Sequence, residues 1–103
     1  MQFTLIGLDA KDESALSRRM AARPAHLALA GEMQEQKRLL YACALLDDAE
    51  RMVGTIMILD FSSREELDNW LKVEPYKVGN VWEKIEIRRC QVPAHFLHEP
   101  VAI

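Results

Sequence analysis

Residues 23–27, with the sequence Arg-Pro-Ala-His-Leu, lie inside a long run with helical character. A proline inside a helix costs about 3 kcal/mol, because it lacks an N–H donor and clashes with the preceding turn. The pattern therefore predicts that one helical segment ends near Ala22 and that another begins with Pro24 at its first position. His26 would then lie in a first helical turn, where free N–H groups beside Arg23 favour an anion.

The residues before this stretch predict a central strand and then a helix. Within residues 2–8, apolar side chains occupy both faces, which is typical of a strand with neighbours on each side. In the helical region, apolar residues at intervals of four and seven predict one buried stripe, formed by Leu16, Met20 and Leu27. Arg18 and Arg19 are assigned to the solvent-exposed side of that helix.

The second half of the chain has the pattern of a hairpin, a helix and a last strand. Residues 38–46 and 52–61 are apolar runs joined by a short polar connection, which predicts an antiparallel hairpin. Residues 62–66 contain two overlapping capping boxes that start a helix, and Pro75 ends it at Glu74. A turn over residues 76–80 and an edge strand over residues 81–92 follow.

The predicted order β-α-β-β-α-β is that of an α+β, ferredoxin-like fold with a four-stranded antiparallel sheet. Right-handed crossovers place both helices on one face of the sheet, and the strand order is 4-1-3-2. The other face carries apolar groups that include Ile6, Ile56 and Ile58, so we expect two sheets to pack face to face in a homodimer. The domain spans residues 1–92, and the tail, residues 93–103, is expected to pack on the partner subunit.

Composition excludes several classes of protein. The 103 residues suit one domain, and the net charge of -3 without a basic block argues against nucleic acid as a partner. No apolar run is long enough for a membrane span, and no signal peptide is evident, so a cytoplasmic location is expected. Cys43 and Cys90 are expected to be reduced core residues of an intracellular chain, and the strand order places them on opposite edges of the sheet, too far apart for a disulfide.

Two polar residues are the leading candidates for chemistry. His26 suits a general base near neutral pH, and Arg23 on the same side of the helix suits an anion contact. Glu74 is either a solvated helix end compensated by Lys77 or the partner of a cation or a histidine across the fold. Tyr76 follows Glu74 and can line a pocket or the core. His95 and His98 are assigned no role.

These motifs together resemble the YciI-like (YCII-related) family over nearly the whole domain. The resemblance rests on residues 23–27, on Arg38-Leu39-Leu40, and on Glu74-Pro75-Tyr76 followed by Gly79. It implies a dimeric α+β barrel like that of muconolactone isomerase, with a histidine–acid pair that corresponds to His26 and Glu74. One branch of the family is linked to dehydrochlorination of chlorinated hydroxyquinols.

Two departures from the family pattern stand out. The acidic residue is Glu74 where Asp is usual, so the geometry of the pair must differ. The Gly-Pro that is common in the second strand is replaced by Cys43-Ala44, which alters one wall of the pocket.

The sequence leaves three classes of function open. The first is proton transfer or elimination on a small cyclic or anionic metabolite, with His26 as base, Glu74 orienting it, and Arg23 and Tyr76 contacting the substrate. The second is a non-catalytic ligand-binding or accessory dimer, and the third is a purely structural association domain. No cofactor or metal is predicted, because the sequence has no glycine-rich loop or cluster of metal ligands.

Overall fold

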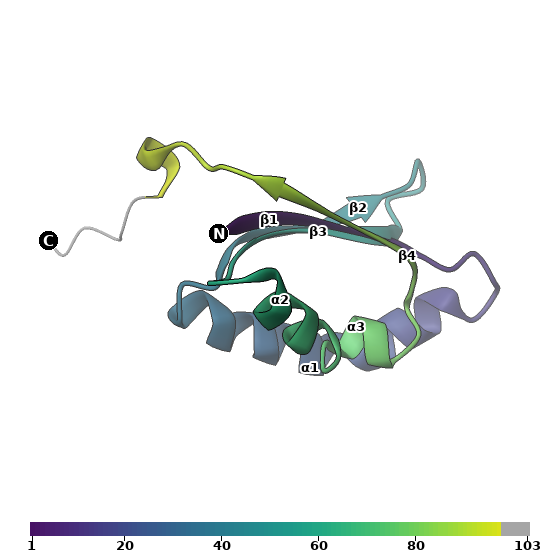
Figure 1. Ribbon diagram of the computed structural model, residues 1–103. Helices are drawn as coiled ribbons and strands as arrows, with labels where there is room; N and C mark the ends of the chain where they lie inside the picture. The colour runs from purple at the N-terminus through teal and green to yellow at the C-terminus, as the bar shows by residue number, and fades with distance from the viewer. Residues whose placement is uncertain (98–103) are drawn as a thin grey trace, which may run out of the picture.

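The structure, a computed structural model, describes residues 1–97. Its elements in chain order are β1 (Gln2–Asp9), α1 (Ala15–Glu35), β2 (Leu39–Leu46), β3 (Met52–Asp60), α2 (Arg64–Leu71), α3 (Pro75–Val78), β4 (Trp82–Cys90) and the 3-10 helix η1 (Ala94–Phe96). The four strands form one antiparallel sheet in the order β2-β3-β1-β4, and the helices cover one of its faces (Figure 1). The predicted ferredoxin-like fold, the central β1 and the edge position of β4 are confirmed.

The predicted break in the first helix is wrong, because α1 continues through Pro24 without interruption. Pro24 is exposed, so its ring faces solvent, and water can reach the carbonyl group that the missing N–H would have bonded. His26 therefore lies in the interior of α1 and not in a first turn. The anion site predicted from free N–H groups at a helix start does not exist there.

The predicted buried stripe of α1 is also wrong. Leu16, Met20 and Leu27 are 41%, 48% and 49% exposed. The residues that α1 buries are Ala15, Arg19, His26 and Met33. Two of these four are polar, so the helix is oriented by the partners of Arg19 and His26 as well as by apolar contact.

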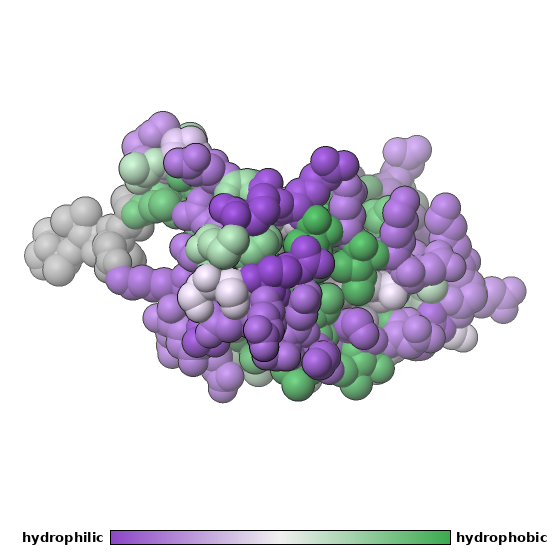
Figure 2. All heavy atoms as spheres, in the orientation of Figure 1, coloured by the Kyte–Doolittle hydropathy of each residue, from purple (hydrophilic) through white to green (hydrophobic). Residues whose placement is uncertain are grey.

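The core lies between the sheet and the helices. Inward-facing residues of β1 and β3, such as Phe3, Leu5, Met57 and Leu59, pack against residues of the helix layer. On the side that Figure 2 shows, the surface is largely polar, and hydrophobic side chains gather along the seam between β4 and the helices.

The α2 helix begins as predicted, since Ser63 is its N-cap and accepts a hydrogen bond from the Glu66 amide at 3.2 Å.

The opposite face of the sheet is open within residues 1–97, because no helix covers it (Figure 1). Thr4, Ile6, Ile56 and Ile58 are only half-buried there. Cys43 on β2 and Cys90 on β4 lie on opposite edges and are both free, as predicted. Their expected place in the core is wrong, because the edge strands leave Cys43 exposed and Cys90 half-buried. Part of the predicted tail, residues 98–103, lies outside the described residues. No helix of the described part is long and apolar enough to cross a membrane.

Replacing Pro24 with alanine should stabilise the protein. The change restores one backbone hydrogen bond and loses little packing, because the ring is exposed. We expect the free energy of unfolding to rise by about 2 kcal/mol. The gain is somewhat less than the intrinsic penalty of proline in a helix, because alanine also gives the unfolded chain more conformational freedom. Urea titration measures the change.

Pro75→Ala is the matched control, because Pro75 occupies the first position of α3, where proline is favourable. It should give no gain in stability. A Pro24→Ala protein no more stable than wild type would contradict this account of α1.

Candidate functional site

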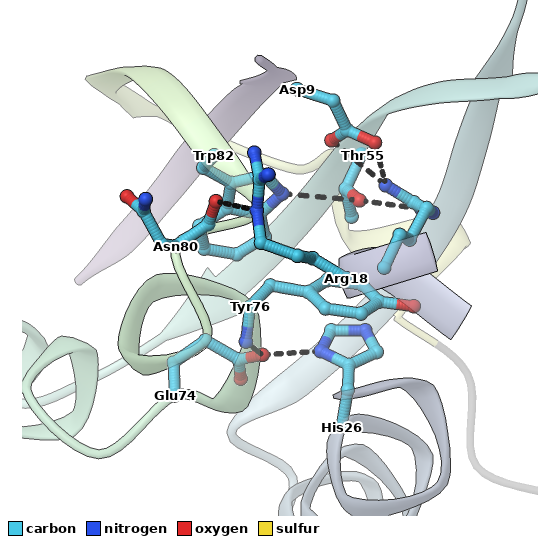
Figure 3. Close-up of polar contacts among 9 residues, drawn as sticks. Asp9, Arg18, His26, Thr55, Glu74, Tyr76, Asn80 and Trp82 are labelled. Atoms are coloured by element: carbon cyan, nitrogen blue, oxygen red, sulfur yellow. Dashed lines mark hydrogen bonds and ion pairs between the residues drawn. The ribbon is translucent and has the colours of Figure 1, made fainter. Parts of the chain in front are cut away.

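The structure brings His26 and Glu74 together between the helix layer and the sheet (Figure 3). His26 projects from α1, and its Nδ1 atom is hydrogen-bonded to Oε1 of Glu74. The two residues are 5% and 1% exposed. A buried carboxylate needs hydrogen-bond partners, and His26 is one of the partners of Glu74. This hydrogen bond fixes the orientation of the imidazole ring. When Nδ1 carries the hydrogen and donates this hydrogen bond to Glu74, the other ring nitrogen, Nε2, carries the free lone pair of the neutral ring.

Glu74 holds its position through the short helix that follows it. It is the N-cap of α3, and the same Oε1 accepts the backbone N–H of Tyr76 at 3.1 Å. Of the interpretations of Glu74, the solvated helix end is therefore wrong, because Glu74 is buried and begins a helix over residues 75–78, where a turn was predicted. Pro75 at the first position of α3 lacks the N–H that would need a partner.

Tyr76 and Trp82 form aromatic walls around His26. The Tyr76 ring is stacked on the imidazole, with centroids 3.8 Å apart and an interplanar angle of 14°. Trp82 approaches the imidazole edge-on at 6.4 Å. Burial raises the pKa of the Tyr76 phenol, so it remains protonated at neutral pH. A Cβ at Gly7 would lie 2.6 Å from the Trp82 indole, so only glycine allows the indole to lie this close to β1.

Arg19 is the residue that sequence reasoning missed. It is 2% exposed, and its Nη1 donates to both carboxylate oxygens of Asp9 at 3.0 Å. Its Nη2 donates to Thr55 Oγ1 at 2.9 Å, and its Cζ lies 4.6 Å from the centre of the Tyr76 ring. Burial raises the pKa of the Asp9 carboxyl, and the charge of Arg19 opposes that rise. The assignment of Arg19 to the outer side of the helix is wrong.

A simple signal could have found Arg19. It lies seven residues before His26, which is two helical turns, so both side chains lie on one face of the helix. Asp9 ends the buried strand β1, and its carboxylate faces Arg19 on this side of the helix.

Arg23 is half-exposed and has no hydrogen bond or ion pair within residues 1–97. Its charge acts on Tyr76, where it opposes the rise in pKa, so it lies near the phenol. Arg18 contacts Asn80 on the α3 flank of the helix, and Arg23, five residues later, lies on the other flank. It is an unpaired cation close to the site, although not at a helix start.

The site has one open side, between α1 and β2. Ala42 and Ala44 pair with the inward-facing Met57 and Thr55, so they share that face of the sheet, yet both are exposed. His26 Nε2 has no hydrogen-bond partner in the described part of the chain. Nε2 is also not fully enclosed. The described side-chain nitrogen and oxygen atoms that are both enclosed and without a partner are Arg19 Nε and Trp70 Nε1, and Nε2 is not among them. The small, exposed side chains of Ala42 and Ala44 cover little of the sheet on this side.

The profile of the YCII-related domain matches residues 1–91. The chain belongs to the YCII-related family. Protein YciI of Escherichia coli O6:H1 and Protein YciI of Shigella flexneri are each 29% identical to it over 94 residues, covering 85% of this chain and 94% of theirs.

Two solved structures share the fold of this YCII-related protein. One is 5-chloro-2-hydroxyhydroquinone dehydrochlorinase (TftG) of Burkholderia phenoliruptrix, in complex with 2,5-dihydroxybenzoquinone. It has a TM-score of 0.78 and 20% identity, covering 92% of this chain and 98% of that one. The other, a dimeric ferredoxin-like protein of unknown function from Jannaschia sp. CCS1, has a TM-score of 0.54 and 17% identity, covering 88% and 98%.

Within residues 1–97, no group of three or more His, Cys, Asp or Glu side chains could hold a metal ion.

Arg19→Met should destabilise the protein strongly. The change leaves the Asp9 carboxylate buried without its cation, and breaking such a pair costs about 3–5 kcal/mol. Chemical denaturation would measure the loss of unfolding free energy.

Arg18→Met is the matched control, because Arg18 precedes Arg19 and pairs with the exposed Asp12. Its cost should be about 1 kcal/mol or less. Equal losses of unfolding free energy in the two variants would show that the buried Asp9–Arg19 pair stabilises the fold no more than the exposed Asp12–Arg18 pair does.

Proposed function

We propose that this YCII-related protein is a cofactor-independent enzyme that transfers a proton to or from a small ring compound, in an elimination or isomerisation. The observation that carries the proposal is the buried His26–Glu74 contact, which leaves Nε2 of the imidazole free. A histidine oriented by a carboxylate is a common general base, because the carboxylate fixes the tautomer and stabilises the imidazolium that forms.

Each neighbouring residue has a role in this proposal. Nε2 of His26 accepts a proton from a hydroxyl group or carbon of the substrate, and Glu74 stabilises the resulting charge. Arg23 is the nearby cation without a partner in residues 1–97, and it offsets the negative charge left on the substrate or on a departing anion. Tyr76 presents a flat aromatic surface beside the imidazole, which suits a flat substrate.

The solved dehydrochlorinase supports the choice of reaction. Dehydrochlorination removes a proton and a chloride ion from one molecule, so it needs a base and a site for an anion. His26 and Arg23 offer these two elements. The likeness to that enzyme is one of fold at 20% identity, so the substrate has to be tested directly.

The test is release of chloride from 5-chloro-2-hydroxyhydroquinone by wild type and variants. Wild type should release chloride above the spontaneous rate. His26→Gln should lower the enzymatic rate by about 10²–10⁴-fold, the usual contribution of a general base. Glu74→Gln should also slow the reaction, because the amide removes the negative charge opposite the imidazole.

His95→Gln is the control, since His95 is exposed on η1. It should react at the wild-type rate. Long-range nitrogen NMR should show the Nδ1–H tautomer of His26 in wild type and a changed ratio of tautomers in Glu74→Gln, while the signals of His95 stay the same. Saturable binding without turnover in wild type would contradict catalysis and leave a ligand-binding domain.

We further propose that the protein is a homodimer formed through the open face of the sheet. The support is the half-buried Ile6, Ile56 and Ile58 on a face that no helix covers, together with the Jannaschia neighbour, which is described as dimeric. The predicted packing of residues 93–103 on the partner subunit belongs to this proposal.

Ile56→Glu should convert the dimer into a monomer, because two such carboxylates would be buried at the two-fold interface. Sedimentation velocity at micromolar concentration measures the change. Val78→Glu is the control, since Val78 is exposed on α3 in the helix layer. A wild-type protein that sediments as a monomer would overturn the homodimer.

A further inference from the structure

The hydroxyl group of Tyr76 is a polar group that has no role in the fold or in the reaction proposed above. Tyr76 is 1% exposed, and its hydroxyl has no hydrogen-bond partner in the described part of the chain. The described side-chain atoms that are both enclosed and without a partner are Arg19 Nε and Trp70 Nε1, so the little surface that Tyr76 exposes includes its hydroxyl oxygen. Buried tyrosine hydroxyl groups usually have a partner, so this one offers a free donor at a point that a ligand can reach.

Both faces of the Tyr76 ring are already in contact with the protein. The imidazole of His26 is stacked on one face, with centroids 3.8 Å apart, and Cζ of Arg19 lies 4.6 Å from the ring centre. Figure 3 shows Asp9 and Thr55, the two partners of Arg19, on the side of the ring opposite to His26. This narrows the contact of Tyr76 with a substrate to its hydroxyl end.

The Tyr76 hydroxyl and Nε2 of His26 are directed to the same side of the stacked rings. Figure 3 shows the hydroxyl on the side of the imidazole that faces away from Glu74. Nδ1 is bonded to Glu74, so the edge that faces away carries Nε2. Two hydrogen bonds to one oxygen atom span roughly 5 Å, and the rings are closer than that, so one oxygen can bond both groups. The neutral imidazole accepts and the phenol donates, which are the two needs that a single hydroxyl group meets.

We propose that the Tyr76 hydroxyl is a second catalytic group, which binds a phenolic hydroxyl of the substrate and stabilises its oxygen as His26 takes the proton. The inference rests on the proposed function and deepens it. It names the substrate class, a ring with a phenolic hydroxyl, and it adds a hydrogen-bond donor to the base.

The proton transfer is balanced within these groups. The O–H bond of the substrate breaks, an N–H bond forms at Nε2 of His26, and the electron pair stays on the substrate oxygen. Tyr76 keeps its own proton and donates a hydrogen bond to that oxygen, which becomes stronger once the oxygen is charged. Glu74 stabilises the imidazolium from the other side of the ring.

The charges around Tyr76 suit a donor to an oxyanion. Burial raises the pKa of the phenol, and the negative charges of Glu74 and Asp9 add to the rise, so the group is protonated at neutral pH and can donate. The positive charges of Arg19 and Arg23 oppose that rise, because they favour negative charge at the hydroxyl end of the ring. The same two charges favour a phenolate oxygen placed next to the hydroxyl.

The test is a spectroscopic titration with 4-nitrophenol, whose neutral and ionised forms absorb at different wavelengths. Wild type should bind it as the phenolate, because His26 takes the proton and Tyr76 bonds the oxygen. Tyr76→Phe should bind the phenolate about 10- to 100-fold more weakly, the effect of losing one hydrogen bond to a charged group.

Two controls separate this effect from a change in structure. Tyr76→Phe keeps the ring that is stacked on His26 and the amide that caps α3, so its free energy of unfolding should equal that of wild type. Tyr41→Phe is the matched control, because Tyr41 is the other tyrosine of the chain and is 72% exposed on β2. It should bind 4-nitrophenol as wild type does. Equal affinity in Tyr76→Phe and wild type, or no binding by wild type, would overturn the inference.

His26→Gln distinguishes this inference from the proposed function. Glutamine cannot take the proton, so 4-nitrophenol should not be ionised on binding to this variant. If His26→Gln fails to ionise the compound while Tyr76→Phe keeps wild-type affinity, the histidine base stands and the role of Tyr76 is overturned. If Tyr76→Phe weakens binding of the phenolate but wild type releases no chloride, the dehydrochlorination is wrong and the contact of Tyr76 with phenols is supported.

Discussion

The buried ion pair between Asp9 and Arg19 holds the helix layer against the sheet. Arg19 is one of four residues that α1 buries, and its side chain reaches Asp9 at the end of β1, Thr55 on β3 and the Tyr76 ring on α3. A buried guanidinium is tolerated only where such partners exist, so the pair fixes the rotation of α1 about its axis. That rotation, two helical turns further on, directs His26 to Glu74 and turns Leu16, Met20 and Leu27 outward.

Local pattern was enough to predict the sheet and the start of α2. The apolar residues on both faces of β1 and the serines before α2 depend on near neighbours in sequence, which a sequence displays directly. The buried face of α1 was not predictable in this way, since two stripes at helical spacing competed and the more polar one is buried. What decides between them is Asp9 and Glu74, which come from distant parts of the chain.

The His26–Glu74 pair could be inferred from the resemblance to the YCII-related family, but its geometry could not. The continuity of α1 through Pro24 shows why: the helix is held on both sides of the proline by Arg19 and His26, and these tertiary contacts outweigh a local penalty of about 3 kcal/mol. A rule about proline alone therefore put His26 in the wrong part of a helix while still naming the right region of the chain.

Glu74 shows how closely folding and the candidate chemistry are coupled. One of its carboxylate oxygens caps α3 by accepting the Tyr76 amide and also bonds the imidazole of His26. N-cap positions usually carry shorter side chains, and here the longer glutamate turns back so that its carboxylate accepts the Tyr76 amide of its own helix. The same contact that begins α3 brings the Tyr76 ring over His26, so the tautomer of the histidine, the aromatic wall beside it and the stability of α3 cannot vary independently. A glutamine at this position retains an oxygen for the cap and removes the charge, which makes the charge the one element of the site that can be separated from the fold.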